Sequence, residues 1–405
     1  MTEHILSQID PAVLGARLQE MRRSAGFTQQ AVADELEMAR TTLVAIEKGE
    51  RRVTPHELLR LASIYGRQVS EIVGRPAVAE SFVPQFRAGL RDQFAQDLGL
   101  QAVTVELQKL AEDYVELETI CGLPMARAYP VPYDVSRSSP DRAAEEVATA
   151  ERNRLGIGDG PISNLRDRLE SDVGLRIFLF KMPAKISALF GYNDTLGGCI
   201  GINADHPRDR RNWSLTHEYG HFLTDRFQPE VTFLRERRNQ SRSERFADEF
   251  AENFLMPAAG LNRRFTELHR SSAAGSITLA QLCTLADLYQ VSVQAMIRRL
   301  ENLGRLPSGT WDSLTSGGFK PRRAQELLGI EPNPPEGKLP RRYTALAVMA
   351  YEKGELSEGQ FARMLRTDRV SARERLEQVN RKVTAESDTG YESLDVELAH
   401  CVEGR

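Results

Sequence analysis

Two histidines four residues apart place the strongest constraint on what this chain can fold into. His217 and His221 frame the pentad HEYGH within NWSLTHEYGHFLTDRF, residues 212–227. On a helix, residues i and i+4 lie on one face, so both imidazoles can reach a single ion. Glu218 is displaced around the helix, where it can reach a water on that ion without binding the ion itself. The pattern predicts a helix with two metal ligands and a general base.

A third ligand must come from another part of the chain. A catalytic zinc has three protein ligands and leaves its fourth position to water. The longer pattern HExxHxxGxxH would need glycine and histidine where the chain has Thr224 and Phe227. The segment SRSERFADEFAENFLMP, residues 241–257, offers Glu244 and Asp248 on one helical face instead. Glu244 can bind zinc, and Asp248 can accept a hydrogen bond from the far nitrogen of a ligating histidine.

Three short apolar segments lie before the pentad. LRIFLFKM, ISALFGYN and GGCIGIN are rich in Ile, Leu and Phe and are bounded by turn residues. They predict a small three-stranded sheet next to the HEYGH helix. We expect GGCIGIN to be an edge strand to which an extended substrate can pair, and Cys199 within it to be a packing residue.

The order of these segments resembles the ImmA/IrrE family of zinc metallopeptidases. The carrying residues are LTHEYGHFL and ERFADEFAENFLMP, with Ala247, Phe250 and Ala251 and the LMP ending at residues 255–257 in the positions of the family's second signature. The resemblance implies a zincin-like peptidase core with gluzincin-type ligands over residues 156–270. The family is often fused behind an Xre-type domain.

The resemblance also implies the roles of the site residues. His217, His221 and Glu244 are expected to bind Zn²⁺, and Glu218 to take a proton from water as it attacks a peptide carbonyl. For the oxyanion, Tyr192, His206 and Tyr219 are conceivable donors, although a packing or surface role is favoured for each of these three.

Residues 10–75 have the apolar spacing of five short helices. The stretches RLQEMRRSAGFTQQAVADEL and RTTLVAIEKGERRVTPHELLRLASIYG resemble the Xre and lambda-repressor class of helix-turn-helix domains. The resemblance implies that Gln29 touches phosphate, and that Arg40, Thr41 and Thr42 read base edges in DNA.

The same segment departs from that class at two positions. Glu37 stands at the turn position that is usually glycine, and Ala39 stands where the reading helix usually has a serine cap. Residues 1–75 also contain as many acidic as basic side chains. A helical interaction module without DNA affinity therefore remains an alternative for this domain.

The rest of the chain reads as helical. Residues 76–155 are expected to be a helical connector, and residues 271–380 a helical C-terminal domain with helix-turn-helix-like segments. The first of these, residues 276–306, is favoured as a structural cap on the peptidase core. Residues 381–405 are acidic and predict a flexible tail. The expected fold class is mainly α with a small β-sheet, an α+β protein.

Composition limits the cellular setting. The chain has 405 residues and a formal net charge of −4, so DNA binding must be a local property. The N-terminus lacks the pattern of a signal peptide, and no stretch approaches the ~20 apolar residues of a membrane helix. The four cysteines are far apart and predict reduced thiols. A cytoplasmic protein with no membrane contact is expected.

These features predict a zinc endopeptidase that cleaves a regulatory protein, such as a repressor or antitoxin, and binds DNA through residues 10–75. Stress, phage-related and toxin-antitoxin responses are the expected contexts. A homodimer is expected if the N-terminal domain reads a palindrome. The alternative is a non-proteolytic transcription regulator or antitoxin-like protein whose peptidase fold senses a metal or ligand.

Overall fold

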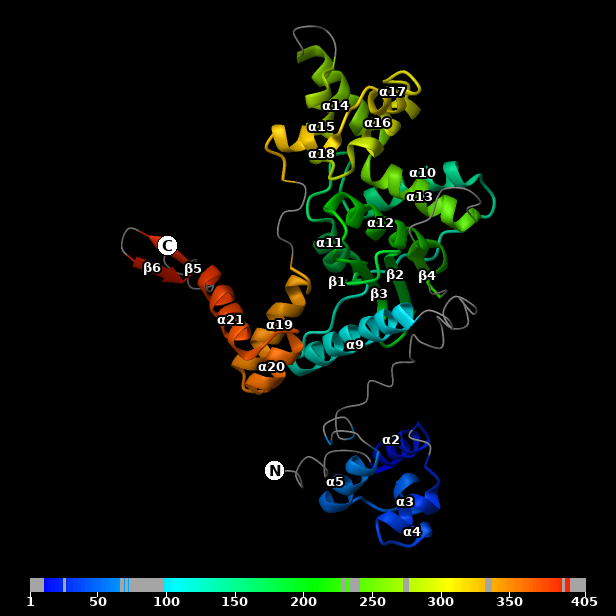
Figure 1. Cartoon of the computed structure of the whole chain (residues 1–405), viewed down its shortest axis with the longest axis vertical. Coiled ribbons are helices and arrows are strands. Elements are labelled where there is room, and N and C mark those ends of the chain that lie inside the picture. The colour runs from blue at the N-terminus through cyan, green and yellow to red at the C-terminus, as the bar shows by residue number, and fades with distance from the viewer. Residues whose placement is uncertain are drawn as a thin grey trace, which may run out of the picture. The chain divides into compact units, whose positions relative to one another are not determined.

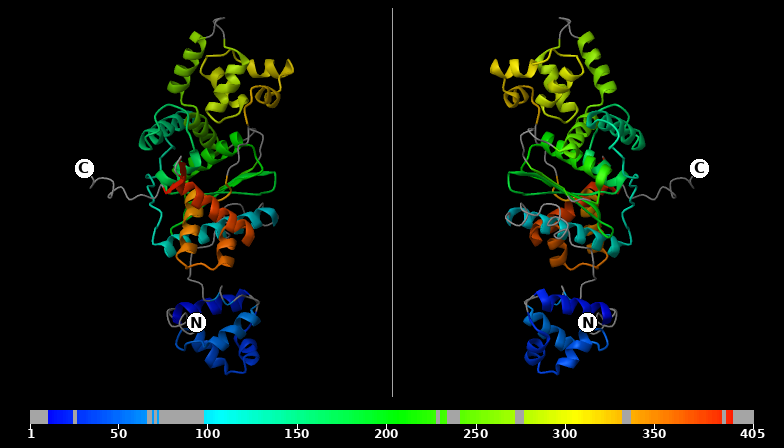
Figure 2. Two further views of the ribbon diagram at one scale, coloured as in Figure 1. Left: turned by 90° about the vertical axis from the view of Figure 1, so that its left-hand side faces the viewer. Right: turned by 90° about the vertical axis from the view of Figure 1, so that its right-hand side faces the viewer.

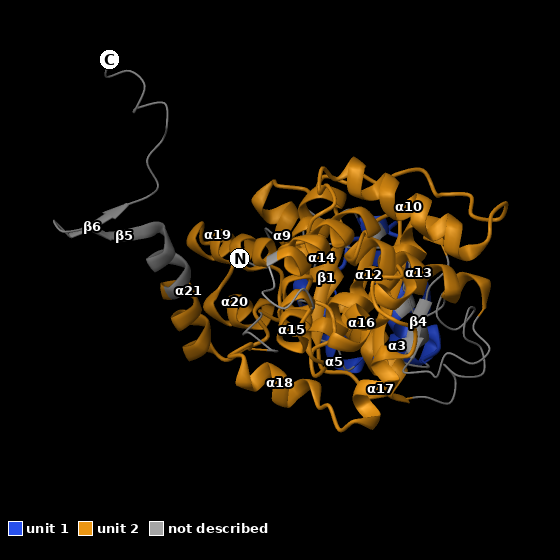
Figure 3. Ribbon diagram, turned by 90° about the horizontal axis from the view of Figure 1, so that it is seen from above, with its two compact units in different colours: residues 1–78 blue, residues 79–405 orange. Residues whose placement is uncertain are grey.

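The computed structural model describes residues 11–24, 27–65, 69, 72, 98–227, 230–233, 241–271, 277–331, 337–387 and 390–393. The chain divides into two compact units, residues 1–78 and 79–405 (Figure 3). It is mostly helical and contains a small mixed sheet, which agrees with the predicted α+β class. Within the described ranges, no helix is long and apolar enough to cross a membrane.

Four helices form the described part of the first unit: α2 (Pro11–Ser24), α3 (Gln29–Glu35), α4 (Arg40–Glu47) and α5 (Pro55–Ile64). Thr28 and Thr54 cap α3 and α5 by accepting backbone hydrogen bonds. The fifth helix predicted for this region falls almost wholly outside the described residues. Glu37 has a φ of +56°, the left-handed conformation that explains why a glycine is usual at this turn.

A buried ion pair joins the helices of this unit. The Nε of Arg22 on α2 lies 2.6 Å from Oε1 of Glu47 on α4, and its Nη2 donates to Oε2 at 3.1 Å. The amide of Gln29 on α3 donates to the same carboxylate at 2.9 Å. Burial alone would raise the pKa of Glu47, but the hydrogen bonds from Arg22 and Gln29 outweigh it and lower that pKa.

The second unit is built around a four-stranded sheet (Figure 1). Its strands are β1 (Arg176–Phe180), β2 (Ile186–Asn193), β3 (Gly197–Asn203) and β4 (Glu230–Phe233), in the order β1-β3-β2-β4. β1 runs parallel to β3, and β2 runs antiparallel to both β3 and β4. The three predicted strands are present, and β4 extends the sheet at one edge.

The expectation that GGCIGIN forms an edge strand is wrong. This segment is β3, which pairs with β1 on one side and with β2 on the other. A strand whose backbone groups are paired on both sides cannot accept a substrate strand. Cys199 is fully buried in β3. The pattern of apolar residues shows that a segment is a strand but does not show its place in the sheet.

Helices cover both faces of the sheet (Figures 1 and 2). On one face lie α12 (Arg208–Asp225), α13 (Arg242–Leu255) and α10 (Pro140–Arg154), and on the other lie α9 (Leu98–Cys121) and α19 (Arg341–Glu352). Strand side chains alternate between the two cores: Ile177 and Leu179 join the α12 side, and Phe178 joins the α9 side. The expected connector, residues 76–155, thus supplies α9 and α10 to these layers.

The remaining described elements are short and mostly helical: α11 (Leu165–Arg168), a π-helical turn (Leu169–Val173), α14 (Ala258–Ser271), α15 (Leu279–Leu288), α16 (Val293–Asn302), α17 (Thr310–Ser316), α18 (Pro321–Leu327), α20 (Glu358–Met364), α21 (Arg369–Val383), β5 (Thr384–Ser387) and β6 (Gly390–Ser393). β5 and β6 pair within the segment predicted to be a flexible tail, and residues 394–405 lie outside the described residues.

Replacing Glu47 by Gln should destabilise the first unit by about 3 kcal/mol, because the buried guanidinium of Arg22 loses its counter-ion. Amide hydrogen exchange of peptides from residues 11–65, measured in the full chain, reports this loss. Since folding lowers the pKa of Glu47, its contribution is fully present above the ordinary pKa of 4.5 and is lost as the pH falls through the folded value. The difference in unfolding free energy between the Glu47→Gln variant and the parent should therefore become smaller at acid pH.

Glu50→Gln is the matched control, because Glu50 is exposed and its nearest cation, Lys48, is 4.0 Å away. An exposed ion pair of this kind contributes little to the stability of the fold. Equal exchange rates in the Glu47 and Glu50 variants would contradict the stabilising role of the buried pair.

Candidate metal centre

The HEYGH segment lies in the middle of α12, the helix that packs on the sheet. Tyr219, Phe222 and Leu223 point into the core and are fully buried. The packing of these apolar side chains fixes the rotation of the helix. His217, Glu218 and His221 are also buried, with 2%, 0% and 5% of their surface exposed.

A close helix contact brings α13 to the histidines. Gly220 on α12 faces Ala247 on α13, and a Cβ atom at residue 220 would lie 3.3 Å from the Cα of Ala247 and 3.2 Å from a ring carbon of Phe250. Only a residue without a side chain allows this approach without displacing its neighbours. Glu244 lies in the first turn of α13, three residues before Ala247, and the contact therefore places its carboxylate over α12.

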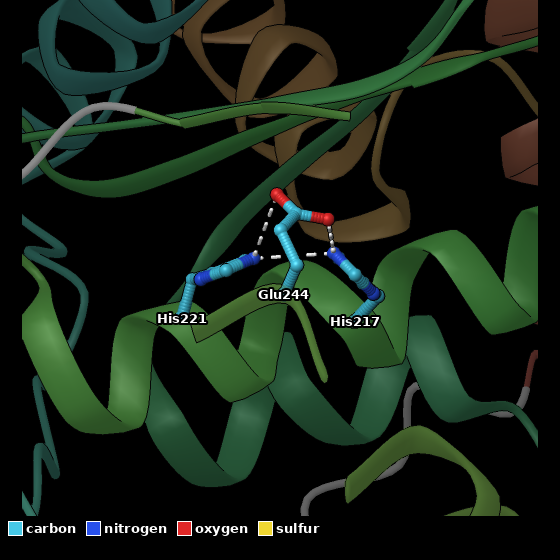
Figure 4. Close-up of side chains that lie close together, drawn as sticks. All are labelled: His217, His221 and Glu244. Atoms are coloured by element: carbon cyan, nitrogen blue, oxygen red, sulfur yellow. Dashed lines mark hydrogen bonds and ion pairs between the residues drawn. The ribbon is translucent and has the colours of Figure 1, made fainter. Parts of the chain in front are cut away.

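The three predicted ligands converge on one point (Figure 4). The Nε2 atoms of His217 and His221 are 3.1 Å apart, and the carboxylate oxygens of Glu244 lie 3.6 Å from the first and 3.9 Å from the second. Ligand atoms about 2 Å from a tetrahedral ion are about 3.3 Å apart, so this donor set fits a zinc-sized cation. Within the described part of the chain, it is the one His, Cys, Asp and Glu group with such spacing.

The outer nitrogens of both histidines have partners. Nδ1 of His217 donates to Oδ1 of Asp248 at 2.9 Å, and Nδ1 of His221 lies 3.2 Å from Oγ of Ser243. When each Nδ1 carries the proton, each Nε2 keeps its lone pair for a metal. The sequence pattern pointed to Asp248 but missed Ser243. The only signal for Ser243 is its place on α13 directly before Glu244.

The pKa values of the two histidines are shifted in opposite directions. Burial lowers the pKa of His217, but the hydrogen bond to Asp248 and the charges of Glu218 and Glu244 outweigh burial and raise it. Burial and the nearby charge of His217 hold the pKa of His221 well below its ordinary value. The carboxylates of Asp248, Glu218 and Glu244 therefore favour positive charge at His217, whereas His221 is held neutral.

Tyr219 belongs to a buried network rather than to a substrate site. Its hydroxyl donates to Glu151 on α10 and accepts from Arg154 at 3.1 Å, while Tyr133 donates to the same carboxylate at 2.9 Å. This network holds α12 against α10. Tyr192 on β2 donates to Asp194 at 3.2 Å.

The four residues predicted to contact DNA lie on α3 and α4. Arg40 and Thr41 are exposed at the start of α4, and Thr42 is half-buried. The amide of Gln29 donates to Glu47, and its oxygen accepts from Arg40 at 3.4 Å. The structure therefore places Gln29, at the start of α3, beside Arg40, at the start of α4, and their contacts with DNA remain a prediction.

Comparison with known proteins finds family models that match two separate parts of the chain. Residues 170–301 match the family model of the IrrE N-terminal-like domain, a peptidase family, and residues 13–72 match that of a helix-turn-helix domain. No curated protein matches the chain significantly. The crystal structure of ComR from Streptococcus suis matches at 10% identity over 92% of this chain and 96% of that one, with a TM-score of 0.16.

The matched peptidase region contains α12 and α13, which carry the three converging side chains, and its family supports a metallopeptidase-type enzyme. The matched N-terminal region contains the helix pair α3 and α4 and supports DNA binding. The chain therefore carries an IrrE-like peptidase domain behind a helix-turn-helix domain.

Proposed function

We propose that the chain is a zinc-dependent endopeptidase that cleaves a regulatory protein of the repressor or antitoxin type. Its N-terminal domain couples this cleavage to sequence-specific DNA binding, in a stress, phage-related or toxin-antitoxin response. The observation that carries the proposal is the convergence of His217, His221 and Glu244, with both histidines oriented through their outer nitrogens. Two imidazoles and one carboxylate are a ligand set typical of catalytic zinc.

In this proposal, His217, His221 and Glu244 hold the ion. Zinc at that position supplies a Lewis acid, which polarises a peptide carbonyl and makes a water molecule more acidic. Asp248 and Ser243 keep the imidazole rings in the orientation that ligation needs. Glu218 follows His217 directly on α12 and is fully buried, and its charge adds to the hydrogen bond of Asp248 in raising the pKa of His217, which supports a role for that carboxylate beside the ion.

Glu218 is the proposed general base. Its carboxylate takes a proton from the attacking water and gives it to the nitrogen of the leaving amine, so one side chain serves both halves of the hydrolysis. A site that only stores a metal needs no carboxylate next to its ligands. The presence of Glu218 therefore favours the enzyme over the alternative of a metal-sensing regulator without proteolysis.

Burial of the site supports a narrow substrate range. Glu218 is fully buried, and the side chain of Glu244, at 26% exposed, is the most accessible of the proposed ligands. The proposed mechanism needs Glu218 to contact only the attacking water, and the exposed part of Glu244 marks the side from which a peptide can approach. We infer that cleavage is restricted to a protein segment that fits this approach, which would limit indiscriminate proteolysis.

DNA binding is assigned to the start of α4. Arg40 and Thr41 are exposed there, and an arginine can donate two hydrogen bonds to guanine. A domain of this class reads a palindrome as a dimer, and we therefore propose a homodimer on its operator.

Glu218→Gln should lower peptide hydrolysis by at least about 10³-fold while the protein keeps its zinc, because only the base is lost. Zinc content is measured by mass spectrometry, and cleavage is followed on regulatory proteins encoded beside this chain. Asp225→Asn is the control, since Asp225 is an exposed acid on the same helix. Cutting by the Glu218 variant, or a parent protein without stoichiometric zinc, would falsify the mechanism, whereas a zinc-loaded parent that cuts none of these proteins would favour the sensor alternative.

Asp248→Asn should weaken zinc binding by about 10- to 100-fold, because the amide no longer fixes the proton on Nδ1 of His217. Competition with a chromogenic chelator gives the affinity. Ser243→Ala should have a smaller effect, since a neutral hydroxyl orients His221 less strongly than a carboxylate orients its partner. An unchanged affinity in the Asp248 variant would show that the hydrogen bond has no part in ligation.

Arg40→Ala should relax the preference for guanine at one position of the sequence selected from a library of random DNA duplexes, because loss of a two-bond contact with guanine costs about 1–3 kcal/mol. Sequencing of the bound fraction gives the preference. Lys48→Ala removes an exposed cation from the other end of α4 and should keep that preference. The assignment is wrong if both variants select the same sequence as the parent.

A further inference from the structure

The C-terminal helices α20 and α21 repeat the local structure of α3 and α4. Each pair begins with a hydroxyl cap, Thr28 or Ser357, which accepts a hydrogen bond from the backbone three residues later. In both pairs the first helix has seven residues, and the second helix starts at the same distance from the cap, at Arg40 and at Arg369. The match extends from the cap to the start of the second helix, which has eight residues in α4 and 15 in α21.

The turns of the two pairs are also the same. Glu37 and Arg366 occupy the same position and both have left-handed backbone, with φ of +56° and +54°. The N–H of Glu37 donates to the carbonyl of Asp34 at 3.1 Å, and the N–H of Arg366 donates to that of Arg363 at 3.0 Å. The two chain segments therefore bend by the same hydrogen-bond pattern.

The next turn residue repeats as well. The N–H of Met38 donates to the carbonyl of Ala33 at 2.9 Å, and the N–H of Thr367 donates to that of Ala362 at 3.0 Å. Both alanines are buried where the first helix packs against the second. A small residue at that place lets the two helices approach closely.

The start of α21 has the exposure of a reading helix. Arg369 and Val370 are exposed, Ser371 is half-buried and Ala372 is buried, in the same order as residues 40–43. Val370 is 66% exposed and occupies the position of Thr41, which is exposed at the start of α4. An arginine beside an exposed apolar side chain suits a base edge and a thymine methyl group.

The helix pair α20 and α21 carries a charge that suits DNA better than the charge of the helix pair α3 and α4. Residues 357–377 contain five arginines and four acidic residues, whereas residues 28–48 contain two basic and four acidic residues. Glu358 occupies the position of Gln29, but Arg373 pairs with it at 2.6 Å and offsets its charge. Arg369 remains as an exposed cation at the start of α21, whereas Arg363, which is also exposed, acts on Asp113 and Glu116 of α9.

The opposite side of the α20–α21 pair is held by α9 and α19, which belong to the same unit. Arg366 forms ion pairs with Asp113 at 2.8 Å and Glu106 at 3.2 Å, both on α9. The hydroxyl of Tyr343 on α19 donates to the carbonyl of Met364 at the end of α20. These contacts hold α20 and the turn and leave the start of α21 exposed.

The helix pair α15 and α16 shows that this turn alone does not make a DNA-binding surface. Gln290 has the same left-handed turn, with φ of +54°. However, Val293 at the start of α16 is buried, and Arg299 donates to Asn253 at 2.7 Å and to the carbonyl of Met256. That pair packs onto the peptidase core, as the sequence favoured for residues 276–306.

We propose that α20 and α21 form a second DNA-binding helix-turn-helix, in which the start of α21 enters the major groove of duplex DNA. Arg369 contacts phosphate or guanine, and Val370 contacts base edges. This surface is separate from the N-terminal domain and does not depend on proteolysis.

The test measures binding of the full chain to a random 30-base-pair duplex, by fluorescence anisotropy over a range of salt concentrations. All measurements use a chain that already carries Arg40→Ala, so that the N-terminal domain contributes less to DNA binding. Adding Arg369→Glu should lower the affinity by about tenfold and make the slope of log affinity against log salt less steep by about one. Arg264→Glu is the control, because Arg264 is an exposed arginine on α14.

A second measurement does not depend on affinity. A photoreactive phenylalanine analogue at Val370 should cross-link to the duplex, and the same analogue at Arg264 should not. Equal affinity and salt slope for the Arg369 and Arg264 variants, together with no cross-link from residue 370, would overturn the proposal. Thermal melting of each variant confirms that these exposed substitutions leave the fold intact.

Discussion

The approach of α12 and α13 at Gly220 and Ala247 is the constraint on which the metal centre depends. Without it, Glu244 would lie too far from the histidines for one ion to contact all three. The contact is steric, since a Cβ at residue 220 would press on the neighbouring helix. The sheet supports α12 from behind, where the ring of Phe222 packs against Phe190 of β2. Packing places the three proposed ligands, and the hydrogen bonds of Asp248 and Ser243 only complete the orientation of the histidines.

Much of the candidate site follows from short-range regularities that a sequence shows directly. The spacing of His217 and His221, and that of Glu244 and Asp248, fixes which side chains share a helical face. Hydroxyl caps such as Thr28 and Thr54 mark where helices begin. The three strands before the pentad follow from apolar runs bounded by turn residues. All of these signals depend on residues a few positions apart.

The features that the sequence did not reveal depend on contacts between distant residues. β1 pairs with β3, so the segment predicted to be an edge strand is central. α9 and α10 cover opposite faces of the sheet, although a connector was expected there. Ser243 has a common residue type and becomes informative only once His221 lies beside it. Strand order and helix packing involve long-range pairing, which periodicity does not encode.

Among the described residues, three of the four non-glycine positions with positive φ, Glu37, Gln290 and Arg366, occupy the same turn within a helix pair. A side chain in the left-handed region costs roughly 1–2 kcal/mol relative to glycine. The chain thus stores about 3–6 kcal/mol of backbone strain at three equivalent junctions, a quantity comparable to the whole stability of a small domain. Its paired helices are held by cores strong enough to tolerate turns that have not been optimised for stability.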